Sequence, residues 1–189
     1  MDRRQALKNL GLISGGIFLL PSCDFSDEKV SIILNKLHIT PEEENLLKEV
    51  VATIIPEGEM PGARSLDVHN FIWVMIDDCL PKKKQDSFMN GLKLFTKHVQ
   101  QLRNTSFSSL TENNRLTVLK DLLNKNDKSG EKNDLRSIRR FIQAVKYYGT
   151  WGFMQSEYIM TEVMPYQLVP GTYGSCEKID NNKRVNING

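Results

Sequence analysis

Apolar residues recur at helical spacing through most of the chain. The segment Thr40-Pro41-Glu42-Glu43 predicts a helix start, because Thr40 can cap the helix, Pro41 suits its first position and Glu43 completes a capping box. The apolar positions that follow lie on one face of a helix: they are Leu46, Leu47, Val50, Val51 and Ile54. The Pro- and Gly-rich segment 56–62 then ends this first helix in a loop.

The same spacing predicts further helices toward the C-terminus. One runs from Val68 to Leu80 and ends at Pro81, which can also open the next helix. The apolar stripe of that next helix consists of Phe88, Leu92, Phe95 and Val99. A further helix starts at Thr111-Glu112, and its apolar stripe consists of Leu116, Leu119, Leu122 and Leu123. The lead-in Val30–Ile39 is apolar but irregular, and it fits either a strand or a helix.

A polar loop at 124–133 precedes another predicted helix at 134–148. Gly149 and Gly152 are expected to interrupt this helix, by a turn or a kink, before a last helical stretch at Trp151–Met164. The sequence holds no alternating strand pattern and no internal repeat. It therefore predicts an all-α fold, a single compact multi-helix domain with an irregular C-terminal tail.

The first 22 residues have the features of a cleavable export signal. Arg3 and Arg4 precede a mildly apolar run, Leu10–Leu20, which is too short to span a bilayer core that needs roughly 20 residues. Paired arginines before such a run resemble a twin-arginine (Tat) signal, which exports folded proteins. Asp2 and Ala6 depart from the residues commonest in that signal.

The end of this segment, Leu20-Pro21-Ser22-Cys23, resembles a bacterial lipobox, although Pro21 is atypical at its position. Acylation of Cys23 with two or three chains would give stable membrane anchoring. The alternative is an uncleaved N-terminal helix with a buried cysteine. The predicted division is a Tat-type lipoprotein signal peptide at 1–22, a tether and irregular lead-in at 23–39, the helical domain at 40–176 and a flexible tail at 177–189.

The remaining cysteines, Cys79 and Cys176, form an even pair once Cys23 is acylated. Export to an oxidising compartment favours a disulfide between them. Two unrelated buried thiols are the alternative.

The net charge argues against nucleic acid as a partner. The signal segment holds three basic residues and one acidic residue, so the remainder keeps 22 of the 25 basic and 22 of the 23 acidic residues. A formally neutral chain lacks the basic face that binds a phosphate backbone. The apolar content, 40%, is sufficient for a core.

Catalytic, cofactor and metal motifs are absent from the sequence. It has no dinucleotide-binding or phosphate-loop motif and no C-x-x-C pair. His69, Asp77 and Asp78 lie around one predicted helix, but about two turns separate His69 from Asp77, which is not ligand spacing. A surface acidic pair near a helix end is the favoured interpretation. We therefore predict no catalytic, cofactor-binding or metal-ligating residue in this chain.

One aromatic stripe is a candidate partner surface. Tyr147, Trp151 and Tyr158 follow at i, i+4 and i+11. Such stripes belong to the core in most proteins, whereas exposed ones mark contact surfaces.

Several short motifs, in this order, resemble the gluconate 2-dehydrogenase subunit 3 family. They are the twin-arginine start, Ile54-Ile55-Pro56 with Pro61-Gly62-Ala63, Asp77-Asp78-Cys79, and Ser156-Glu157-Tyr158 through Val169-Pro170-Gly171-x-Tyr173-x-x-Cys176. The likeness runs from about Thr40 to Cys176.

This resemblance implies a small, cofactor-free accessory subunit of a periplasmic sugar or sugar-acid dehydrogenase. In that family a flavoprotein large subunit holds FAD and performs the oxidation, and a cytochrome c subunit with haem often carries the electrons onward. The resemblance also implies that the flavoprotein travels as the passenger of the small subunit's Tat signal. No catalytic residue carries over to this chain.

Three functions follow, in decreasing order of preference. The first is a non-catalytic subunit that escorts and anchors such a dehydrogenase in the periplasm or cell envelope. The second is a free-standing helical envelope lipoprotein that binds a small ligand or an envelope component. The third is an enzyme with an unrecognised site built from His69, Asp77 and Asp78.

Overall fold

The computed structural model describes residues 30–124 and 133–164. The chain is helical in these ranges, and no strand occurs within them. The α-helices are α2 (Pro41–Ile54), α3 (Val68–Val74), α4 (Lys82–Arg103), α5 (Glu112–Asn124) and α6 (Asn133–Met154). Two π-helices, η2 (Met75–Cys79) and η4 (Ile159–Val163), and one 3-10 helix, η3 (Phe107–Ser109), complete the set. The predicted all-α fold is confirmed.

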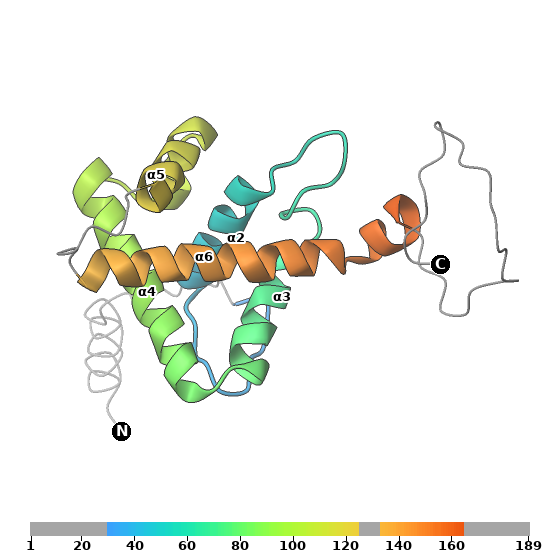
Figure 1. Ribbon diagram of the computed structural model, residues 1–189, viewed down its shortest axis with the longest axis horizontal. Coiled ribbons are helices and arrows are strands. Elements are labelled where there is room, and N and C mark those ends of the chain that lie inside the picture. Colours follow the sequence, from blue (N-terminus) through green and yellow to red (C-terminus); the bar gives the residue numbers. More distant parts are fainter. Residues whose placement is uncertain (1–29, 125–132, 165–189) are drawn as a thin grey trace, which may run out of the picture.

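Helix α6 is the central element of the domain. It packs against α2, α3, α4 and α5, and in Figure 1 it runs across the width of the molecule. Helices α3 and α4 form a V that meets at η2 and the turn after it. The largest fully buried side chains come from α3, α4 and α6, and they include Trp73, Phe95 and Phe141. The Phe95 ring packs against Phe141 at a tilt, and Phe88 of α4 makes T-shaped contacts with both Trp73 and Phe141, which fixes the helices in one arrangement.

The predicted start of α2 is confirmed in detail. The Thr40 hydroxyl accepts a hydrogen bond from the Glu43 backbone N–H at 3.2 Å, and the Thr40 N–H donates to the Glu43 carboxylate at 3.1 Å. This capping box satisfies two N–H groups that the first turn of a helix leaves without an intrahelical partner. The predicted helix from Val68 to Leu80 is also present, as α3 continued by η2.

The expected interruption at Gly149 and Gly152 is wrong, because α6 continues through both positions to Met154. Both glycines are buried and face another helix at close range. A Cβ atom at Gly149 would lie 2.8 Å from Val51 Cγ2. A Cβ atom at Gly152 would lie 2.5 Å from Phe71 Cδ1. Here glycine permits close helix packing, and its low helix propensity is overridden by tertiary contacts.

Two smaller expectations also differ. Leu116, expected in the apolar stripe of α5, is exposed, and Val118 is buried in its place beside Leu119 and Leu122. The lead-in Val30–Ile39 forms neither a strand nor a helix.

The loop between α2 and α3 is held by short-range hydrogen bonds. The Glu57 carboxylate accepts from the Gly62 N–H at 2.6 Å and from the Ser65 N–H at 3.0 Å. These bonds lower the pKa of Glu57. A Cβ atom at Gly62 would lie 2.6 Å from the backbone of Pro56 and Glu57, so only glycine fits there. The motif residues of this loop therefore have a structural role.

None of the helices in the two described ranges is both long enough and apolar enough to cross a membrane.

Replacing Gly91 by Ala should destabilise the domain although Ala favours helices. The new Cβ would lie 2.7 Å from Phe141 Cβ and 2.9 Å from the Ser137 carbonyl oxygen, and these atoms of α6 cannot move independently of the helix. Such overpacking costs about 1–3 kcal/mol of unfolding free energy, measurable by urea denaturation. Gly58→Ala is the control, because nothing lies within 4 Å of that position. Equal stability of the two variants would contradict the packing role of Gly91.

Candidate functional site

An apolar groove runs along the outer face of the C-terminal half of α6. Its volume is about 570 Å³. Tyr147, Trp151 and Met154 line it because spacings of four and three residues place side chains on one face of a helix. Their exposed fractions, 66%, 44% and 38%, are high for large apolar side chains. Lys146 is the one charged residue in the lining.

Contacts beneath the groove hold its aromatic rings in place. The rings of Trp151 and Phe71 of α3 meet at 84° with centroids 5.6 Å apart. Phe71 can approach α6 this closely because Gly152, the neighbour of Trp151, has no side chain. Tyr147 packs at 82° against Tyr148, whose pKa is raised mainly by burial. The rings are therefore pre-oriented, which lowers the entropy lost when a partner binds.

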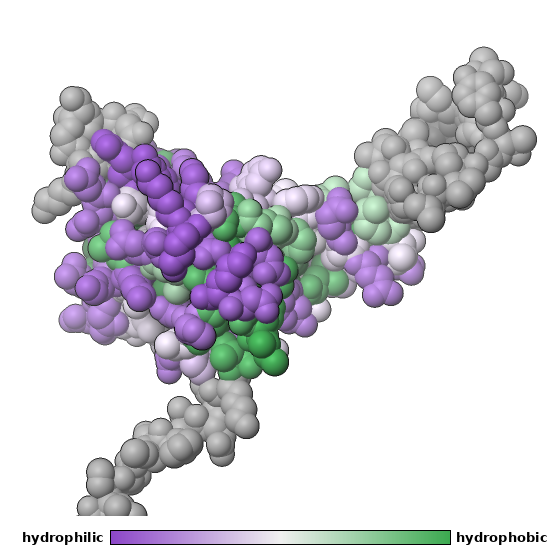
Figure 2. Space-filling model, turned by 90° about the horizontal axis from the view of Figure 1, so that it is seen from below, coloured by the Kyte–Doolittle hydropathy of each residue, from purple (hydrophilic) through white to green (hydrophobic). Residues whose placement is uncertain are grey.

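Hydrophobic surface is not confined to this groove. Figure 2 shows hydrophobic residues over the middle of the face in view, most densely at its lower edge, and paler ones toward the C-terminal end of α6, while hydrophilic residues dominate its left half. Exposed aromatic and Met side chains beside polar surface are typical of protein contact sites. The arrangement suits binding of an apolar surface.

The other candidate residues lie apart from the groove. Tyr158 follows the end of α6, is half-buried and does not line the groove. Cys79 is exposed at the end of η2. Cys176 lies outside the described residues, so the disulfide stays a prediction. Arg3, Arg4 and Cys23 also lie outside them.

His69 and Asp77 are buried within the domain and do not form a joint site. The nearest carboxylate oxygens to the His69 ring nitrogens belong to Glu44, at 3.8 Å, and Asp67, at 3.9 Å. Burial lowers the pKa of His69, so the ring is neutral at pH 7. Within residues 30–124 and 133–164 no three His, Cys, Asp or Glu side chains lie close enough to hold a metal ion.

The interpretation of Asp77 and Asp78 as a surface pair is wrong for Asp77, which is only 1% exposed. Its carboxylate accepts three backbone hydrogen bonds from the lead-in, from Asn35 at 2.6 Å, Lys36 at 3.0 Å and Leu37 at 2.7 Å. These bonds replace the water that a buried carboxylate loses. Asp77 thus fastens the lead-in to η2.

The lead-in is fastened at a second point. The Glu44 carboxylate accepts from the Ser31 N–H at 2.9 Å and from the Ser31 hydroxyl. The side chain of Lys36 also donates to the carbonyl oxygens of Asp77 and Asp78, at 3.1 and 3.3 Å. Residues 31–37 are therefore part of the folded body.

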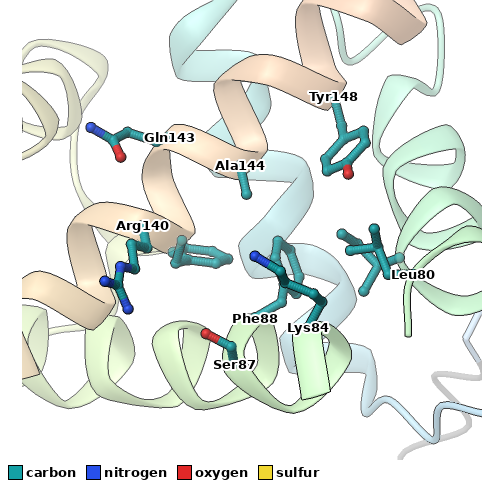
Figure 3. A pocket seen from close by; sticks show the side chains of 10 residues that line it. Leu80, Lys84, Ser87, Phe88, Arg140, Gln143, Ala144 and Tyr148 are labelled. Atoms are coloured by element: carbon teal, nitrogen blue, oxygen red, sulfur yellow. The ribbon is translucent and has the colours of Figure 1, made fainter. Parts of the chain in front are cut away.

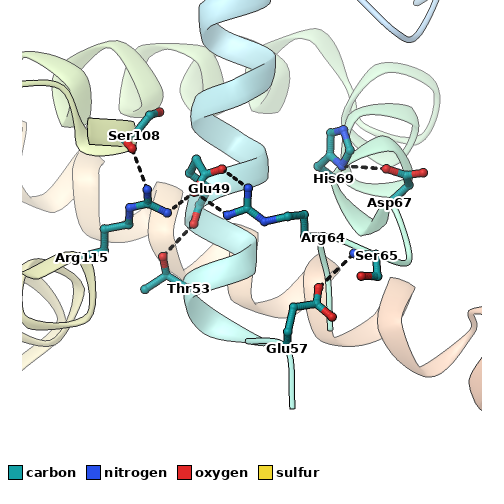
Figure 4. Close-up of polar contacts among 9 residues, drawn as sticks. All are labelled: Glu49, Thr53, Glu57, Arg64, Ser65, Asp67, His69, Ser108 and Arg115. Atoms are coloured by element: carbon teal, nitrogen blue, oxygen red, sulfur yellow. Dashed lines mark hydrogen bonds and ion pairs between the residues drawn. The ribbon is translucent and has the colours of Figure 1, made fainter. Parts of the chain in front are cut away.

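An ion cluster that no sequence motif predicts is centred on a buried carboxylate. Glu49 of α2 is 5% exposed and binds two guanidinium groups. Arg64 contacts both of its oxygens, at 2.7 and 2.8 Å, and Arg115 of α5 binds it from the other side (Figure 4). Arg115 also donates to the Ser108 carbonyl at 2.6 Å. No local motif signals this cluster, because 66 residues separate Glu49 from Arg115.

The fold and the groove define a small helical domain with an apolar contact surface. The family model described as gluconate 2-dehydrogenase subunit 3 matches residues 41–171, and the chain belongs to this family. It is thus related to one subunit of a multi-subunit dehydrogenase. The searches of curated proteins and of solved structures found no match.

Asp77→Asn should release the lead-in from η2. The substitution removes the charge and places an amide donor among three backbone donors, which should cost about 2 kcal/mol or more. Hydrogen exchange at residues 35–37 should accelerate, and urea denaturation should show the lower stability. Asp78→Asn is the control, because Asp78 is exposed and its carboxylate accepts, among the described residues, one hydrogen bond, from the Asn35 side chain at 3.1 Å. Unchanged exchange in Asp77→Asn would contradict the fastening.

Proposed function

We propose that this chain is the non-catalytic subunit that escorts a flavin-dependent sugar or sugar-acid dehydrogenase through Tat export and anchors it to a membrane. Family membership supports a dehydrogenase partner. The twin-arginine segment and Cys23 support export and lipid anchoring. FAD is held by the partner, and haem by a cytochrome c subunit where the complex has one. The complex resides in the periplasm or cell envelope.

The observation that carries the proposal is the exposed aromatic face of α6. Tyr147, Trp151 and Met154 leave a groove of about 570 Å³ open at the surface of the described part of the chain. Aromatic anchors in an apolar surface supply most of the binding energy of many protein interfaces. Membership of the family suggests what binds in this groove, namely a surface of the dehydrogenase subunit.

The fastened lead-in supports the anchoring role. Lipid on Cys23 would be followed by a short tether and then by residues 31–37, which Glu44 and Asp77 bind to the body. Few residues remain between the anchor and the folded domain. A docked partner would therefore be held close to the membrane surface.

Replacing Arg3 and Arg4 by Lys should strand both proteins in the cytoplasm, because Tat export depends on the arginine pair. Cell fractionation should find this chain and the flavoprotein together in the cytoplasmic fraction. Replacing Lys8 by Arg, in the same segment, is the control and should leave export intact. Export of the flavoprotein at its usual level from the Arg-pair variant would refute the escort role.

Tyr147→Ser combined with Trp151→Ser should separate the subunits. Loss of an aromatic hot spot costs about 2 kcal/mol or more, about a 30-fold weakening. After gentle detergent extraction, gel filtration with an absorbance spectrum should show the flavin eluting with the unaltered chain and apart from the variant.

Leu102→Ser is the matched control, because Leu102 is an apolar side chain of α4 with 56% exposure. The single variant Tyr147→Ser guards against misfolding, since it leaves the contact between Trp151 and Phe71 intact. A flavin peak that stays with both Tyr147 variants would exclude this face as the docking site. A colourless peak of the unaltered chain alone would favour a free-standing lipoprotein.

A further inference from the structure

A second pocket lies between α4 and α6 and has a different chemical character from the groove. Its volume is about 370 Å³, within the range of about 300–1,000 Å³ that is common for small-molecule sites. η2 and the residue after it close one end through Ile76 and Leu80. Ala144 belongs to the lining as well, and the buried rings of Phe88 and Phe141 form the base of the pocket.

Two cationic side chains line this pocket beside its apolar residues. Lys84 comes from the first turn of α4 and Arg140 from α6. Figure 3 shows them on the same side of the pocket as Ser87, with Tyr148 on the other side. In the described ranges neither Lys84 nor Arg140 forms an ion pair, and no acidic residue lines the pocket.

The start of α4 adds to the positive potential. Its first turn has no acidic residue and no side-chain cap, so the partial positive charge of its N–H groups is uncompensated. Burial raises the pKa of Tyr148, so its hydroxyl remains a hydrogen-bond donor at neutral pH. The cavity thus has two cations on one side and a hydroxyl donor on the other.

We propose that this pocket binds a small single-chain amphiphile with a carboxylate head group. The carboxylate would lie between Lys84 and Arg140, because a guanidinium group pairs with both oxygens of a carboxylate. The Ser87 hydroxyl can donate a further hydrogen bond. The alkyl chain would lie against Leu80 and Ala144, which are the partly exposed apolar residues of the lining, and the small volume admits one short chain.

The pocket is separate from the proposed docking groove, although Gln143 borders both. Binding of the amphiphile requires no dehydrogenase subunit. The test therefore uses this chain alone, and a negative result would not count against the proposed function.

The test is calorimetric titration of the full-length chain carrying Cys23→Ser, which cannot be acylated. Octanoate supplies the head group and the tail, acetate the head group alone, and octan-1-ol the tail alone. We expect octanoate to bind about tenfold or more tightly than either, because charge-assisted hydrogen bonds are worth about 1.5–3 kcal/mol. Equal affinity for octanoate and octan-1-ol would overturn the proposal.

Lys84→Gln with Arg140→Gln should weaken octanoate binding about tenfold or more and leave octan-1-ol binding unchanged. The matched control is Lys83→Gln with Arg136→Gln, which removes the same charge from exposed neighbours outside the pocket lining. Equal weakening of octanoate binding by both pairs of substitutions would overturn the proposal, because the loss of affinity would then follow from the change in net charge alone.

Filling the cavity gives an independent test. Ala144→Leu adds side-chain volume within the pocket lining and keeps both cations, so octanoate binding should be lost. Thermal unfolding checks that each variant is folded. If the pocket variants instead lose binding to phosphatidylglycerol vesicles while octanoate binds no better than octan-1-ol, the cations contact a membrane surface and the pocket proposal is wrong.

Discussion

Close contact between α6 and its neighbours is the constraint on which the rest of the domain depends. Three glycines make that contact possible, Gly91 on α4 and Gly149 and Gly152 on α6. Each allows an opposing side chain or backbone to approach where a methyl group would collide. Because α6 packs against four other helices, its position sets theirs as well.

The same packing determines which surface remains for a partner. With one face of α6 buried against α2, α3 and α4, Tyr147, Trp151 and Met154 have to lie outside. Phe71 then supports Trp151 from beneath. A rigid helical face of this kind suits a family whose members are subunits of a larger dehydrogenase.

Buried carboxylates connect the lead-in and the loop after α2 to the helices. Asp77 and Glu44 bind the lead-in, and Glu49 joins the loop after α2 to α5 through Arg64 and Arg115. Removing one partner from such a cluster leaves a charge without compensation in a medium of low polarity, which is strongly destabilising. These groups therefore maintain the fold.

The sequence by itself determined most of the helices, the capping box of α2 and the family, because periodicity, capping and short motifs involve residues a few positions apart. It also singled out Tyr147 and Trp151. Only the tertiary structure decided that Gly149 and Gly152 continue α6, that Asp77 is buried, and that Glu49 has two arginine partners. Each of these outcomes depends on groups far apart in the chain, and such contacts leave no local pattern to read.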